Sequence, residues 1–126
     1  MIILNFAHPL TAEQQEQIEQ MTEIAIREIH DVSCQFDNNR PFPPQIADIV
    51  EKIPLSADAW QTEALLINPP SYAPAASTLL AELHGRSGYF PTFIRIRPVA
   101  NSVVPRFEVA EIIDLQQVRA EARFKR

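Results

Sequence analysis

The sequence predicts an α/β protein with a Rossmann-like three-layer sandwich and a mostly parallel sheet. Strand-like segments alternate with amphipathic helical segments along the chain, as expected for successive β-α-β units. The connection before the last strand is too short for a helical crossover, so we expect that strand to run antiparallel at one edge. A chain of 126 residues without a linker or repeat fits one domain spanning residues 1–126.

The first half of the chain is expected to fold as strand, helix, strand and helix. Residues 2–6 form an apolar strand, and Thr11 opens a T-x-x-Q capping box before a helix that ends near Met21. Ile18 and Met21 are its expected inward side chains. Residues 24–36 alternate with one slip of phase, which predicts a bulge or two short strands. A second helical face follows in residues 46–53, and residues 55–60 are expected to form a turn.

The second half is expected to add two helices and three strands. Residues 64–67 are an apolar strand, followed by a turn and a helix with Leu79, Leu80 and Leu83 facing inward. Residues 93–97 and 106–113 alternate as strands, and Asp114 is the expected cap of a final helix.

Composition excludes several classes of protein. The net charge of −5 disfavours binding of long nucleic acid, which requires a basic face. No apolar run is long enough to span a bilayer, and the N-terminus does not resemble a signal peptide. One cysteine, Cys34, allows no internal disulfide, so we expect a cytoplasmic protein. With only Gly85 and Gly88, neither a Walker loop nor a dinucleotide-binding glycine turn can form, and the histidines show no metal-ligand spacing. We therefore expect no metal and no cofactor.

Ligands of parallel α/β sheets bind beyond the carboxyl ends of the strands. The loops expected there form a polar, amide-rich rim, whereas residues 84–89 (HGRSGY) should lie at the opposite end. Those loops are AHPLT (7–11), QFDNNRPF (35–42), NPPSYAP (68–74) and PVANSVVP (98–105).

The N-P-P segment after the third strand is similar to the adenine-binding motif of N6-adenine methyltransferases. A serine separates the prolines from Tyr72, and the glycine-rich cofactor loop is absent, which argues against methylation. Two prolines also simply stiffen a strand-to-helix turn. Asn68 and the helix terminus at Ser71 remain candidates to receive a phosphate or a sugar.

The titratable candidates each have a purely structural alternative. His8 at the end of the first strand could move a proton, or could only order the turn before Pro9. Arg95 and Arg97 could reach a phosphate, or could lie at an exposed edge or an oligomer contact. Cys34 fits a small buried hydrophobe better than a nucleophile.

Four blocks, FAHPLT, QFDNNRPF, LLINPPSYAPAASTLLAELHGRSGYFPT and RFEVAEIIDLQ, cover most of the chain. Together they resemble the Csx family numbered fifteen, short proteins encoded beside type III CRISPR systems of antiviral defence. The resemblance implies a CARF-like domain that binds a cyclic oligoadenylate, most simply cyclic tetra-adenylate. It implies that the protein damps signalling by sequestering this messenger or by opening it as a metal-independent ring nuclease.

The near two-fold symmetry of such a ring implies a homodimer or a higher homo-oligomer. Phe36 or Tyr72 would stack on adenine. For ring opening, His8 is the candidate for proton transfer and Arg40 for charge stabilisation. The expected ligand-binding residues are Asn5, Thr11, Phe36, Asp37, Asn38, Asn39, Asn68, Ser71 and Tyr72.

Two alternatives stay open beside this resemblance. One is a non-enzymatic adaptor or structural protein that binds another CRISPR component through its helices and basic tail. The other is an enzyme that acts on a different nucleotide.

Overall fold

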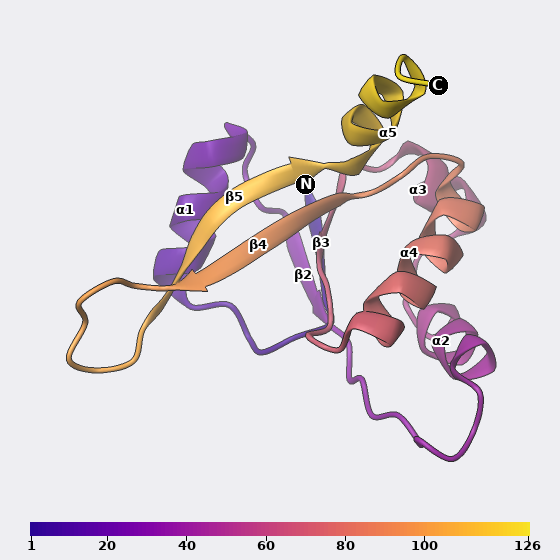
Figure 1. Ribbon diagram of the computed structural model, residues 1–126, viewed down its shortest axis with the longest axis horizontal. Helices are drawn as coiled ribbons and strands as arrows, with labels where there is room; N and C mark the ends of the chain where they lie inside the picture. The colour runs from indigo at the N-terminus through magenta and orange to yellow at the C-terminus, as the bar shows by residue number, and fades with distance from the viewer.

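The computed structural model describes all of residues 1–126. It contains one five-stranded sheet and five helices (Figure 1). In chain order the elements are β1 (Ile2–Asn5), α1 (Ala12–Thr22), β2 (Glu28–Asp31), α2 (Phe42–Glu51), α3 (Ala57–Thr62), β3 (Leu65–Asn68), α4 (Ala73–Ser87), β4 (Thr92–Pro98), β5 (Phe107–Asp114) and α5 (Leu115–Arg123).

The sheet has the strand order β2-β1-β3-β4-β5, with the first four strands parallel and β5 antiparallel to β4. Helix α1 lies on one side of the sheet and α2, α3 and α4 on the other (Figure 1). The expectation of a mostly parallel, Rossmann-like α/β sheet with an antiparallel last strand is therefore confirmed.

Period-two alternation along the short strands builds a core on each face of the sheet. In β1, Ile2 and Leu4 pack with the helices α2, α3 and α4, whereas Ile3 packs on the other face against Ile18 of α1. In β3, Ile67 joins the first core and Leu66 the second. Because both faces of β1 and β3 are covered, these strands read as continuous apolar runs.

The capping predictions are confirmed at both ends of the chain. The Thr11 hydroxyl accepts a hydrogen bond from the backbone N–H of Gln14, and the Gln14 side chain accepts one from the Thr11 N–H, which completes the capping box. Asp114 caps α5 by accepting from the N–H of Gln117 at 3.1 Å.

Three expectations about the first half of the chain are wrong. Residues 24–36 form only the four-residue strand β2, because this edge strand pairs with β1 alone and ends where β1 ends. Residues 57–62 form helix α3 rather than a turn, since Ser56 caps the N–H of Ala59 and Trp60 is buried. Met21 is 48% exposed; it lies in the last turn of α1, which ends at Thr22 and is followed by Glu23 in the left-handed region.

The connections around β1 and β3 create a topological switch point. From β1 the chain passes through α1 to β2 on one side, and it later reaches β3 on the other side of β1 through α2 and α3. The loops leaving these two adjacent strands therefore diverge toward opposite faces of the sheet, one into α1 and one into α4. Such a divergence opens the crevice in which ligands of this sheet architecture bind.

The connection between β4 and β5 does not join the other carboxyl-end loops. Residues 99–106 project away from the sheet at the tip of the long hairpin (Figure 1). None of the helices has the length and apolar character needed to cross a bilayer.

Candidate functional site

A groove runs along the carboxyl edge of the sheet at the switch point. It consists of three adjoining depressions, with volumes of about 610, 360 and 580 Å³, that share lining residues. The first two share His8, Pro70 and Ser71, and the last two share Phe36 and Tyr72. We call this combined surface the carboxyl-edge groove. Depressions of this size are in the range of small-molecule sites.

The floor of the carboxyl-edge groove is an asparagine network at the ends of three strands. Asn5 of β1 is 1% exposed and Asn68 of β3 is 5% exposed. The Nδ2 of Asn68 donates to the Oδ1 of Asn5 at 2.9 Å, and the Nδ2 of Asn5 donates to Asp31 Oδ1 of β2 at 2.8 Å. Asn5 also donates to the His8 carbonyl and accepts from the Ala7 N–H. Asn5 thus has all four hydrogen-bonding positions used inside the chain, and it reaches the groove only through Asn68.

His8, Thr11 and Ser71 stand along the walls of the groove. His8 lies at its centre, where two of the depressions meet, and its side chain is exposed while its carbonyl is held by Asn5. The Thr11 hydroxyl accepts from Gln14 and keeps its own proton to donate. Ser71 is also exposed.

Helix α4 begins at this groove without a side-chain cap. Its N-cap is Tyr72, one residue later than the Ser71 terminus expected, and no side chain bonds to its first turn. Because Pro74 has no N–H and Ala75 is fully buried, Ala73 is the exposed residue of this first turn that keeps an N–H, and it lines none of the three depressions. The donors on the wall of the groove are therefore the hydroxyl groups of Thr11 and Ser71.

Three aromatic rings form a shelf at the far end of the groove. The rings of Phe36 and Phe42 stack with centroids 5.1 Å apart, and Phe42 meets Tyr72 edge-on at 5.8 Å. Tyr72 is 53% exposed, so one face of the shelf is available to a flat ligand. Asn38 lines the same depression.

The loop between β2 and α2 is fixed from inside by Gln45. Its side chain accepts from the Asp37 N–H and donates to the carbonyls of Asp37, Arg40 and Pro41. The Asp37 carboxylate accepts from the Asn39 N–H and from Arg40 Nε at 3.1 Å. These bonds lower the pKa of Asp37, the Asn39 bond contributing most and exceeding the opposing effect of desolvation.

The predicted site residues therefore fall into two groups. Those that line the groove are His8, Thr11, Phe36, Asn38, Asn68, Ser71 and Tyr72. Asp37, Asn39 and Arg40 form an exposed loop structure beside it, and Arg40 lines none of the three depressions. Arg95 does line the groove, with its Nε 2.7 Å from Glu111 on the neighbouring strand.

Three residues that contribute to this site were not predicted from the sequence. Asp31 and Gln45 act through hydrogen bonds to residues that only the fold brings near. Phe42 was a recognisable aromatic after a proline, and its place in the shelf depends on how α2 packs. The one local signal was Gln45 itself, a polar residue next to the apolar face of α2.

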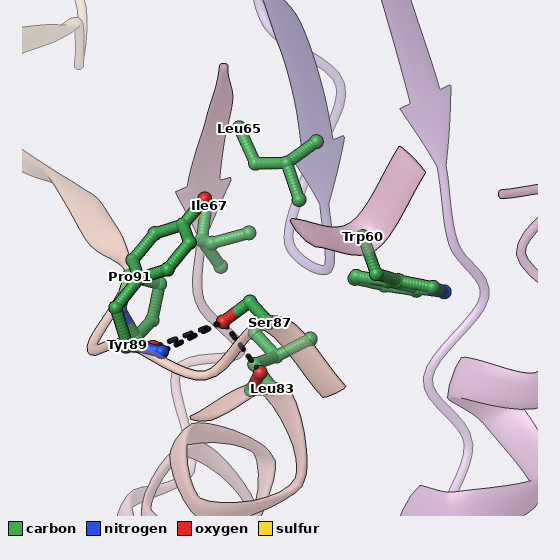
Figure 2. Close-up of a pocket in the computed structure, with 7 residues that line it drawn as sticks. All are labelled: Trp60, Leu65, Ile67, Leu83, Ser87, Tyr89 and Pro91. Atoms are coloured by element: carbon green, nitrogen blue, oxygen red, sulfur yellow. Dashed lines mark hydrogen bonds between the residues drawn. The ribbon is translucent and has the colours of Figure 1, made fainter. Parts of the chain in front are cut away.

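The amino edge of the sheet is closed by apolar packing. The cavity there has a volume of about 10 Å³, no larger than a single water, and Figure 2 shows the residues that line it. The Ser87 hydroxyl lies 2.9 Å from the carbonyl oxygens of Leu83 and Tyr89, so its polar atom is satisfied within the wall. The lining residues are Trp60, Leu65, Ile67, Leu83, Ser87, Tyr89 and Pro91. The 84–89 segment lies at this end, as the sequence predicted.

No three or more His, Cys, Asp or Glu side chains are grouped in a way that could hold a metal ion. Burial raises the pKa of the Cys34 thiol, which lies at the wall of the middle depression.

Comparison of the chain with protein-family models, with curated proteins and with solved structures gives no match. The fold and the carboxyl-edge groove are thus established by the chain's own topology and contacts.

Proposed function

We propose that this chain binds a cyclic oligoadenylate, most simply cyclic tetra-adenylate, in the carboxyl-edge groove of a CARF-like domain. Binding removes the messenger from solution and so damps type III CRISPR signalling, either by sequestration or by ring opening. The proposal combines the family resemblance of the sequence with the chemistry of the groove.

The observation that carries the proposal is the pairing of a hydrogen-bonding wall with an aromatic shelf at the switch point. The hydroxyls of Thr11 and Ser71 offer neutral donors suited to phosphate oxygens. The exposed face of Tyr72 offers a surface on which a purine can stack, a contact worth about 1–3 kcal/mol per base. One end of the groove thus matches the backbone of an oligonucleotide and the other matches its bases.

The charge of the chain favours a compact ligand over a long one. At −5, the protein repels extended polyanions, so binding must come from a few short-range donors rather than from the overall field. A four-phosphate ring is small enough to be held in this way. A two-fold homodimer that places two carboxyl-edge grooves face to face would enclose the ring and match its symmetry.

His8 is the residue through which ring opening would proceed. In that reaction a ribose 2′-hydroxyl attacks the adjacent phosphorus, a 2′,3′-cyclic phosphate forms, and the 5′-oxygen leaves with a proton. The imidazole at the centre of the groove is placed to move such a proton. Arg40 is paired with Asp37 outside the groove lining, so charge stabilisation would come from the hydroxyls of the wall.

Isothermal titration calorimetry with cyclic tetra-adenylate tests the proposal. We expect saturable binding with one ring per two chains, weakened about tenfold by Asn68→Ala or Ser71→Ala through loss of a ligand hydrogen bond. Gln61→Ala, an exposed amide on α3, is the matched control and should bind as the unaltered chain does. Absence of heat with the unaltered chain at high ring concentration would refute the proposal.

Incubation of labelled ring with the protein in EDTA separates the two forms of the function. A linear product that is lost in His8→Ala supports metal-independent cleavage. An intact ring after many hours supports sequestration.

The adaptor alternative has one specific observation in its favour. Helix α5 buries no residue, Val118 in it is 54% exposed, and its C-cap Phe124 is 91% exposed; residues 119–126 also carry four basic side chains. An adaptor would co-elute with a purified type III effector complex, and Val118→Asp would abolish that co-elution while leaving the calorimetry unchanged.

A further inference from the structure

The orientation of every amide in the asparagine network can be assigned from its partners. Asn5 Nδ2 faces two groups that only accept, the Asp31 carboxylate at 2.8 Å and the His8 carbonyl at 2.9 Å. Asn5 Oδ1 faces the Ala7 N–H at 3.1 Å, which only donates. Flipping the Asn5 amide would oppose acceptor to acceptor twice and donor to donor once. Its orientation is therefore fixed by three groups that cannot themselves reverse.

Asn5 in turn fixes Asn68. Since the Asn5 atom that faces Asn68 is an oxygen, Asn68 must present its NH₂ group, at 2.9 Å. Asp31 thus sets the donor and acceptor orientation of the Asn5 amide, and Asn5 sets that of Asn68; we call this chain of hydrogen bonds across three adjacent strands the relay. Its last atom, Asn68 Oδ1, is left as a hydrogen-bond acceptor.

This oxygen reaches the carboxyl-edge groove and has no partner within the chain. Every fully buried side-chain nitrogen or oxygen in the protein is hydrogen-bonded, and Asn68 Oδ1 is not, so it must touch the groove that Asn68 lines. The residue as a whole is only 5% exposed. A nearly buried polar atom held toward an opening is a site for a ligand group, because leaving it unpaired under a bound ligand costs free energy.

We infer that Asn68 Oδ1 accepts a hydrogen bond from a neutral donor on the ligand, foremost a ribose 2′-hydroxyl. This inference rests on the proposed function and sharpens it, since Asn68 was expected to receive either a phosphate or a sugar. An ionised phosphate oxygen facing Asn68 Oδ1 would oppose two acceptors. The hydroxyls of Thr11 and Ser71 lie in the same depression, so a ribose on Asn68 places its phosphate next to donors. The adenine N6 amino group is the other donor that a cyclic adenylate carries.

Three rings distinguish these donors by calorimetry: cyclic tetra-adenylate, its fully 2′-deoxy analogue, and cyclic tetra-inosinate, which lacks the N6 amino group. We expect the deoxy ring to bind the unaltered chain about three- to tenfold more weakly than the ribose ring. That ratio should fall to about one in Asn68→Ala and persist in Gln61→Ala, because only the former removes the acceptor. The inosinate ring keeps the 2′-hydroxyl, so Asn68→Ala should weaken it as much as the adenylate ring, and the inosinate-to-adenylate affinity ratio should be the same in both chains.

If Asn68→Ala changes the inosinate-to-adenylate ratio and leaves the deoxy-to-ribose ratio unchanged, the contact lies at the adenine amino group and the ribose assignment is overturned. If Asn68→Ala changes neither ratio, the inference that Asn68 accepts a ligand hydrogen bond is overturned.

The relay can also be tested without any ligand, by hydrogen exchange of side-chain amides in NMR spectra. Both NH₂ protons of Asn5 and one of Asn68 should exchange slowly, since each of these protons is hydrogen-bonded within the chain and both residues are buried. If both Asn68 protons exchange as fast as those of the exposed Asn39, the assigned polarity is wrong. Failure of every ring to bind while the Asn68 proton stays protected would refute the proposed function and the ribose contact, but not the relay.

Discussion

The two ends of the parallel strands are covered by the same kinds of element and yet differ in how their polar groups are satisfied. At the carboxyl edge, Asn5, Asn68 and Asp31 bond to one another and leave one acceptor facing a groove of several hundred Å³. At the amino edge, Trp60 and its neighbours enclose a cavity of about 10 Å³, and the Ser87 hydroxyl is used internally (Figure 2). One edge is built around hydrogen bonds and the other around packing.

This difference follows from the direction of the chain. At the switch point the loops after β1 and β3 diverge, so side chains at the strand ends face an opening, and polar residues there can meet a ligand. At the amino edge the chain returns from α3 into β3 and from α4 into β4, and apolar side chains close the gaps. Substitutions at the two edges should therefore separate stability from ligand binding.

The largest expected effect is on stability at the amino edge. Trp60→Ala should lower the free energy of unfolding by about 3–5 kcal/mol, because it leaves a large void among Ile67, Leu83 and Pro91. Chemical denaturation measures it, and Trp60→Phe is the milder control. If the folded fraction of Trp60→Phe loses ring binding, the two edges are not independent.

Asn5 should matter for both properties. Asn5→Ala removes four hydrogen bonds and leaves the Ala7 N–H and the Asn68 amide without an acceptor. We expect the free energy of unfolding to fall by about 1–3 kcal/mol. It should also abolish the ribose preference, since Asn68 is then free to rotate. Asn39→Ala, an exposed substitution in the nearby loop, should change stability by less than about 0.5 kcal/mol. Equal unfolding midpoints for the two variants would show that the network contributes nothing.

The smallest effects are expected at the two glycines near the amino edge, and they should differ in sign. Gly85 lies inside α4 with open space where a Cβ would be, so Gly85→Ala should stabilise the protein by about 0.5–1 kcal/mol. Gly88 ends the helix at a φ of 85°, so Gly88→Ala should destabilise it by about 1–2 kcal/mol. Thermal melts measure both, and a destabilised Gly85→Ala variant would show that α4 cannot accept the added methyl.

The parts of this fold that sequence could predict are those with local causes. The capping box at Thr11 and the short connection before β5 each act within a few residues, and both predictions are confirmed. The strand prediction for residues 24–36 is wrong because their apolar alternation is the same whether or not a partner strand extends beside them. The edge position of β2 decides that, and it depends on the whole sheet.

The candidate site divides in the same way. His8, Asn68 and Ser71 could be placed together because the ends of parallel strands meet at one edge. The relay could not be foreseen, because Asn5 pairs with partners 26 and 63 positions away in sequence. Arg40 was expected in the site from its loop, and its pairing with Asp37 three residues earlier directs it elsewhere.

The most direct test of the whole account is an NMR titration of the labelled chain with cyclic tetra-adenylate. We predict saturable backbone and side-chain shifts in residues 7–11, 33–38 and 68–73, with the Asn68 amide among the largest, and little change in residues 84–91. Shifts confined to the amino edge or to α5, or no shift at saturating ring, would contradict it.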